Sequence, residues 1–180
     1  MNTKDLLLQT SPGRSPHPLE LFVRLEGRDE AHFYTQGLTM QDFGTLFAGE
    51  LQSFDALIYR MPAELGPDEA AGLYAHTVAA VAPLDVVVLG VGEDGHTASL
   101  FPGHPALEAP GLAVGIRDSP KPPPQRVTLT LNALRTARRV IILATGAGKA
   151  DAVAKAKRHE VPSGMIAGAR WLIDRAAAGQ

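Results

Sequence analysis

Short apolar runs alternate with polar, helix-compatible stretches along most of the chain. Runs rich in β-branched residues or leucine predict strands. They lie at 5–10, 31–35, 57–61, 85–90, 112–117, 126–131, 140–145 and 171–174. Strands that alternate with helices are typical of an α/β fold, in which helices cover a mostly parallel sheet. The pattern therefore predicts an α/β fold.

The clearest helix begins after Gly66. Pro67 suits the first helical position, and Asp68 and Glu69 favour the positive end of the helix dipole. The apolar positions recur at helical spacing and should pack on the sheet as one stripe. They are Ala70, Leu73, Tyr74, Thr77, Val78 and Val81.

The run 86–89 is apolar without alternation. Such a run is typical of a central parallel strand that helices cover on both faces. In open α/β sheets, ligands bind outside the carboxyl ends of the strands. We therefore expect the functional site directly after residue 90.

Length and composition narrow the possible functions. The 180 residues predict one domain, 1–180. Seventeen basic against nineteen acidic residues give a net charge of −2, which indicates neither a nucleic-acid nor a membrane partner. The absence of cysteine excludes disulfides and thiolate chemistry. Because no apolar segment approaches a signal peptide or the ~20 residues of a membrane span, we expect a cytoplasmic protein.

The loop 90–97 carries the strongest chemical signal. It combines three glycines with Glu93, Asp94 and His96. Neutral imidazole is a suitable general base near pH 7, and Asp94 is placed to orient it. Gly92 and Gly95 allow the backbone to approach a ligand closely. The following residues, 97–99, are expected to open a short helix with free N–H groups.

Two other functions fit this loop less well. It satisfies the G-x-G-x-x-G pattern of dinucleotide sites, with Asp118 at a suitable distance for a ribose contact. The loop's carboxylates oppose pyrophosphate, however, and Pro102 ends the next helix too early for a crossover. A metal site at Glu93, Asp94, His96 and His104 is the other alternative, but no metalloenzyme spacing occurs, so we expect no metal.

Two further turns are candidates for binding an anion. Gly146–Lys149 follows the strand at 140–145, so that backbone N–H groups and the Lys149 ammonium are available to a phosphate. The turn 11–16 follows the first expected strand, precedes an expected helix, and offers Ser11, Gly13 and Arg14. Arg126 shares a strand face with Thr128 and is placed to clamp an anion or to protect a sheet edge.

The stretch 89–103, LGVGEDGHTASLFPG, resembles the signature of the 6-phosphogluconolactonases, and the segments 121–130 and 145–149 match the same family in order. The resemblance implies a Rossmann-like single domain that hydrolyses a phosphorylated sugar δ-lactone without metal or cofactor. It further implies His96 as the base for water and Asp94 as its neighbour. Arg126 and Lys149 would face the substrate, and Ser11 and Gly13 would form the first phosphate loop.

The chain departs from this family at three places. The usual helical segment before the first strand is missing, Pro12 stands in the first phosphate loop, and 35–38 replaces an Asp-Glu-Arg segment. These departures favour, as the alternative, a sugar-phosphate-binding or regulatory domain without catalysis. Isomerase or deaminase chemistry fits less well, because residues 99–101 replace the Phe-Asn-Glu of deaminases. We expect a small sugar phosphate as ligand and a monomer or homodimer.

Overall fold

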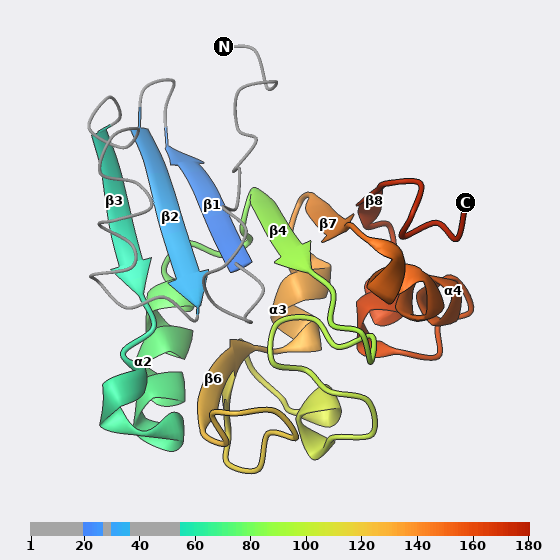
Figure 1. The fold of residues 1–180 in the computed structure, drawn as a ribbon. Helices are drawn as coiled ribbons and strands as arrows, with labels where there is room; N and C mark the ends of the chain where they lie inside the picture. The colour runs from blue at the N-terminus through green and yellow to red at the C-terminus, as the bar shows by residue number, and fades with distance from the viewer. Residues whose placement is uncertain (1–19, 27–29, 37–54) are drawn as a thin grey trace.

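The computed structural model describes residues 20–26, 30–36 and 55–180. Its main sheet has six strands in the order β3-β2-β1-β4-β7-β8 (Figure 1). These strands are β1 (Glu20–Glu26), β2 (Glu30–Gln36), β3 (Asp55–Arg60), β4 (Val86–Gly90), β7 (Val140–Ala144) and β8 (Arg170–Ile173). A separate antiparallel pair consists of β5 (Ala113–Ile116) and β6 (Arg126–Leu129).

Among the six described strands of the main sheet, only β1 runs against the direction of the others. It is antiparallel to both β2 and β4, whereas β2 pairs with β3, β4 with β7, and β7 with β8 in parallel. The predicted mostly parallel α/β sheet is therefore confirmed. Each expected strand from 31–35 onward is present, with bounds that differ by at most two residues. The strand expected at 5–10 lies outside the described residues.

The sequence predicted a helix after the turn 11–16. The first element that the structure describes after this turn is instead the strand β1 (Glu20–Glu26), so this prediction is wrong there. Leu21, Val23 and Leu25 recur at the period of two that strands require. Both edges of β1 form ladders, with Val23 opposite Phe33 of β2 and Val86 of β4. The apolar spacing of this segment does not by itself distinguish a strand from a helix. Pairing on two sides gives its backbone N–H and carbonyl groups hydrogen-bond partners as a strand.

Helix α2 (Pro67–Ala79) confirms the predicted start of the helix but not its whole apolar stripe. It packs mainly against β5 and β6. A Cβ at Gly115 of β5 would lie 2.6 Å from the backbone carbonyl of Pro67, so these two elements touch without an intervening side chain. Tyr74 and Val78 are buried, whereas Leu73 is 49% exposed. Leu73 lies on a part of the α2 surface that β5 and β6 do not cover.

The core lies between the main sheet and the elements that cover it. Its centre contains Val87 and Leu89 of β4 together with Tyr74, Leu129 and Leu134. We expected burial of β4 on both faces, and the described part of the chain buries one face more completely than the other. Burial alternates along β4, with Val87 and Leu89 fully buried and their neighbours only half-buried. Val86 and Val88 point away from this core, since successive strand residues face opposite sides.

The remaining helices are short. They are α3 (Leu131–Thr136), α4 (Ala150–Lys157) and the 3₁₀ turns η2 (Ala63–Leu65), η3 (Pro105–Glu108), η4 (Ala147–Lys149) and η5 (Pro162–Met165). No helix in the described ranges is long and apolar enough to cross a membrane.

Candidate functional site

Two loops meet where the parallel strands β4 and β7 end. Gly90 pairs with Leu143, so the loop that follows β4 and the turn η4 that follows β7 leave the same edge of the sheet. A Cβ at Gly148 would lie 3.3 Å from Oε1 of Glu93, so the Glu93 carboxylate rests against the η4 turn. The structure therefore brings the two candidate loops of the sequence together.

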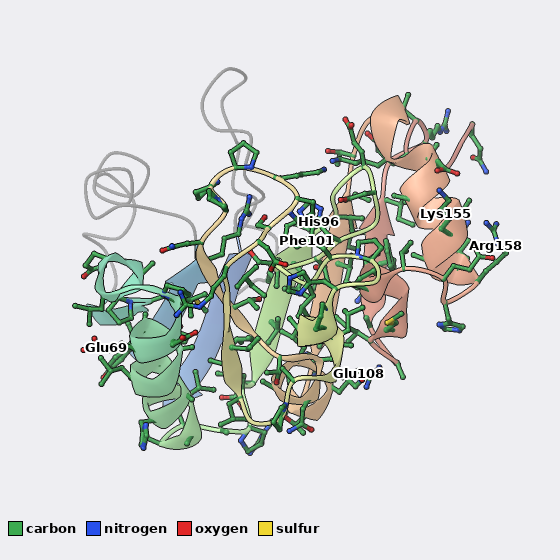
Figure 2. The ribbon with its side chains drawn as sticks, turned by 90° about the horizontal axis from the view of Figure 1, so that it is seen from below. Glu69, His96, Phe101, Glu108, Lys155 and Arg158 are labelled. Carbon is green, nitrogen blue, oxygen red and sulfur yellow. The ribbon has the colours of Figure 1, made fainter. Side chains whose placement is uncertain are left out.

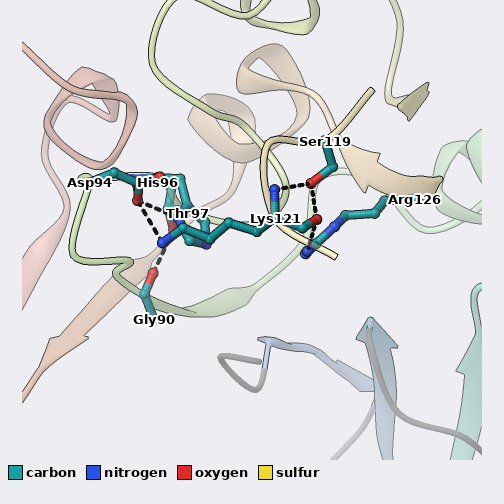
Figure 3. Close-up of polar contacts among 7 residues, drawn as sticks. All are labelled: Gly90, Asp94, His96, Thr97, Ser119, Lys121 and Arg126. Carbon is teal, nitrogen blue, oxygen red and sulfur yellow. Dashed lines mark hydrogen bonds and ion pairs between the residues drawn. The ribbon is translucent and has the colours of Figure 1, made fainter. Parts of the chain in front are cut away.

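Asp94 and His96 form a close pair in the first of these loops (Figure 3). Oδ1 of Asp94 lies 2.5 Å from Nδ1 of His96, and His96 is only 3% exposed. The same oxygen accepts the backbone N–H of His96 at 3.3 Å. A carboxylate that accepts the Nδ1 proton selects the tautomer whose lone pair is on Nε2. This arrangement fixes the ring orientation and leaves Nε2 as the nitrogen that can accept a proton.

The local backbone explains why the pair forms. Gly92 donates its N–H to the carbonyl of His96 at 2.8 Å, which closes the loop on itself. A Cβ at Gly92 would lie 2.0 Å from Nδ1 of His96 and 2.6 Å from Oδ1 of Asp94. Gly95 adopts a φ of +84° and lies against Val161, where a side chain has no room. Packing therefore requires both glycines, Gly92 against the loop itself and Gly95 against Val161.

The short helix expected at 97–99 is wrong. Thr97 and Leu100 form an isolated bridge, and Ala98 turns the chain with a φ of 53°. The Thr97 hydroxyl donates to the carbonyl of Gly90 at 2.8 Å and holds the turn against the end of β4. The N–H of Ser99 is bound to Oγ1 of Thr128, so it is not free for an anion.

Burial and charge tune the Asp94–His96 pair. Burial raises the pKa of Asp94, but the hydrogen bond and charge of His96, assisted by Lys121, outweigh it and hold that pKa below its ordinary value. Burial lowers the pKa of His96, and Asp94 offsets this effect only in part. Lys121 and Arg126 lower the pKa of His96 further. The imidazole is therefore neutral at pH 7 and the carboxylate is charged.

Lys121 was not among the residues that the sequence predicted for the site. Its Nζ lies 3.5 Å from Oδ1 of Asp94, the same oxygen that holds His96 (Figure 3). The available signal was its place in the segment 121–130, which matches the lactonase family. A lysine in a proline-rich loop is ordinarily solvated, and sequence spacing does not show that this loop folds back to Asp94.

Arg126 lies close enough to the pair for its charge to act on His96, and it shares a face of β6 with Thr128. Its guanidinium carbon is 5.5 Å from the ring centroid of Phe101, and the Phe101 ring is 4.6 Å from that of His96 (Figure 2). Its Nε and one terminal nitrogen donate to backbone carbonyls of the preceding loop. Phe101 is a second neighbour of His96 that the sequence did not single out.

The predicted phosphate turn adopts a defined conformation. Gly146 has a φ of 88° and donates its N–H to both carboxylate oxygens of Asp174, at 3.1 and 2.9 Å. That N–H is therefore occupied. Gly148 is exposed at the tip, and Lys149 is half-buried at the end of η4. The first candidate turn, with Ser11, Gly13 and Arg14, lies outside the described residues.

The residues of the metal and dinucleotide alternatives have other contacts. Nε2 of His104 lies 2.8 Å from Asp118, and its Nδ1 accepts the N–H of Ala106. Among the residues that the structure describes, no group of three His, Cys, Asp or Glu side chains gathers as a metal site. The chain after the loop forms tight turns and η3, not the crossover helix of a dinucleotide motif.

The fold and this loop geometry agree with the family comparison. The chain belongs to the family described as glucosamine-6-phosphate isomerases/6-phosphogluconolactonase, whose model matches residues 39–173. A 6-phosphogluconolactonase of Bos taurus is 39% identical over 151 residues, which cover 76% of this chain and 58% of that protein. One from Streptomyces coelicolor is 44% identical over 146 residues, covering 68% and 56% respectively.

Comparison with solved structures also finds proteins of the same fold. A crystal structure titled as devB protein superposes with a TM-score of 0.66 and 31% identity, covering 77% of this chain and 66% of that one. The chain thus spans little more than half the length of these two lactonase relatives.

Proposed function

We propose that this chain hydrolyses 6-phospho-D-glucono-1,5-lactone to 6-phosphogluconate. The observation that carries the proposal is the buried Asp94–His96 pair, with 2.5 Å between Oδ1 and Nδ1, at the carboxyl edge of β4. The relatives named 6-phosphogluconolactonase support the same reaction. Hydrolysis of an ester needs a base for water, and a neutral imidazole held by a carboxylate is such a base.

In the proposed reaction His96 removes a proton from water through Nε2. The resulting hydroxide attacks the lactone carbonyl carbon and forms a tetrahedral intermediate. The bond from this carbon to the ring oxygen then breaks, and the imidazolium returns its proton to the leaving oxygen. Asp94 keeps Nδ1 protonated throughout, so the ring retains the required tautomer. The reaction uses neither a metal nor an organic cofactor.

The phosphate of the substrate is assigned to the η4 turn. Lys149 supplies a positive charge at this turn, beside the Glu93 carboxylate that rests against Gly148. Ser11, Gly13 and Arg14 complete the phosphate contacts in this proposal. A cytoplasmic location and a monomeric or homodimeric state are predictions from the sequence alone.

The decisive experiment measures phosphogluconate formation from the lactone, above its spontaneous hydrolysis, by the purified chain. We expect His96→Ala to lower kcat by about 10²–10⁴-fold, the usual contribution of a general base. His76→Ala is the matched control, because His76 is exposed on α2 and its Nδ1 hydrogen-bonds to the carbonyl of Gly72 in the same helix. An unchanged kcat in His96→Ala would remove this histidine from the mechanism.

A second candidate function is sugar-phosphate binding without turnover. It is favoured by the Thr35-Gln36-Gly37-Leu38 segment, which stands where the resemblance to the lactonases implies Asp-Glu-Arg. It predicts phosphogluconate binding by calorimetry with no acceleration of lactone hydrolysis. Ammonia release from an amino-sugar phosphate would instead indicate deaminase chemistry.

A further inference from the structure

The proline-rich segment between β5 and β6 is folded into a closed turn, which we call the strap (Ser119–Arg126). The N–H of Ser119 donates to the carbonyl of Pro124 at 3.0 Å. The Ser119 hydroxyl donates to the carbonyl of Lys121 at 2.7 Å, and the N–H of Lys121 approaches the same hydroxyl at 3.3 Å. Prolines in the strap supply carbonyls but no N–H groups, so these carbonyls depend on side-chain donors.

Arg126 provides those donors. Its Nε donates to the carbonyl of Pro123 at 3.0 Å, and one terminal nitrogen donates to those of Lys121 and Pro122, each at 2.8 Å. A guanidinium presents its N–H groups in a rigid, planar fork, which a lysine ammonium does not reproduce. The guanidinium also lies over Phe101, whose side chain is 1% exposed. One end of the strap is thus fixed to the core.

The strap presents Lys121 to the Asp94–His96 pair. In Figure 3 the Lys121 side chain extends from the strap to Asp94, while Ser119 and Arg126 hold its backbone. The charged groups acting on His96 in the described part of the chain are Asp94 from its own loop, and Lys121 and Arg126 from the strap. Lys121 and His96 contact the same carboxylate oxygen of Asp94. Moving the ammonium therefore changes how strongly that oxygen interacts with the imidazole.

We propose that Arg126 is a positioning residue: by holding three carbonyls of the strap, it keeps the Lys121 ammonium at the carboxylate that orients His96. This inference deepens the proposed function and rests on it for its catalytic meaning. The sequence expected Arg126 to clamp an anion of the substrate. The strap contacts assign its fork to the protein backbone. Lys121 then favours the neutral, proton-accepting imidazole, because a nearby positive charge opposes protonation.

The test follows the pKa of His96 by NMR titration of its ring Cε1–H signal, which is identified by its loss in His96→Gln. This measurement needs no turnover, so it separates failure of the inference from failure of the lactonase proposal. The variants are Lys121→Met, Arg126→Lys and their combination. Arg158→Lys is the matched control, since Arg158 is an exposed residue paired with Glu160, far from His96 in Figure 2.

We expect Lys121→Met to raise the pKa of His96 by about one unit, at the low end of the effect of a nearby charge. Arg126→Lys keeps its charge but loses the fork, and should give most of the same shift. The double variant should shift no further than Lys121→Met. If the lactonase proposal also holds, the acidic limb of kcat/KM moves upward by the same amount in each variant.

Four results would overturn the inference. A wild-type titration of His96 in Arg126→Lys, with unchanged thermal stability, would mean that only the charge of Arg126 matters. Additive shifts in the double variant would mean that the two residues act independently. A loss of thermal stability with an unmoved titration would mean that Arg126 is merely structural. A shift in Arg158→Lys would show that the titration responds to remote charges and would equally remove the support.

Discussion

Replacing Gly92 by alanine tests the loop geometry most sharply. Gly92 has no strained φ, so the backbone tolerates alanine and the effect is steric. The new Cβ would lie 2.0 Å from Nδ1 of His96 and 2.2 Å from its Cε1, whereas ordinary contact begins at 3.4 Å. The ring must therefore retreat by more than about 1 Å, which breaks its 2.5 Å contact with Asp94.

The magnitude follows from what is lost. A hydrogen bond to a charged group stabilises a protein by about 1.5–3 kcal/mol, and overpacking adds strain of similar size. The two effects together should lower the free energy of unfolding of Gly92→Ala by about 3–6 kcal/mol. A displacement of about 1 Å in a catalytic group costs on the order of 10²-fold in kcat.

Urea unfolding and lactone hydrolysis measure these two effects. Gly72→Ala is the control, because Gly72 lies inside α2 with nothing within 4 Å of its added Cβ. Alanine in a helix interior should stabilise the protein by about 0.5–1 kcal/mol. A Gly92→Ala protein with wild-type stability and kcat would refute the packing argument for this loop.

Other substitutions test the supports of the site. Thr128→Val leaves the buried N–H of Ser99 without its acceptor, and urea unfolding should show a loss of about 1–3 kcal/mol. Gly164→Ala places a Cβ 2.2 Å from the carbonyl oxygen of Ala156, and the thermal midpoint should fall, corresponding to about 1–3 kcal/mol of overpacking. Because the pKa of His96 is lowered on folding, the unfolded chain binds a proton more readily. The unfolding free energy should therefore fall as the pH drops below about 6.5, and less so in His96→Gln when urea midpoints are compared at pH 7 and 5.

The sequence predicted those parts of the site that depend on local order. His96 and Asp94 are two positions apart in one loop after a strong strand pattern, so their proximity follows from the chain itself. The convergence of this loop with the turn ending at Lys149 follows from parallel pairing. The proximity of Asp94 and His96 and the convergence of the two loops depend only on the order and direction of the strands. The alternation of strands and helices in the sequence largely determines both.

The parts that the sequence did not predict depend on side chains meeting across the fold. Lys121 reaches Asp94 because the strap is closed by Ser119 and Arg126, and no spacing rule encodes this closure. The turn at Ala98 replaces a helix because the Thr97 hydroxyl finds the end of β4. Leu73 belongs to the predicted apolar stripe of the helix, but it is exposed because β5 and β6 do not cover it. In each case tertiary contacts override a local preference.

The reversed strand β1 joins the sheet's two parallel groups, since among the described strands β2–β3 and β4–β7–β8 are linked only through Glu20–Glu26. A shortened chain beginning at Met61 would keep Asp94, His96 and the strap. It would lack β1, however, so one edge of β4 would lose its paired strand. An uncovered edge next to a core strand is a template for pairing with another copy. Engineered minimal versions of this protein should therefore retain β1, or replace its edge protection with charge or proline, to prevent self-association.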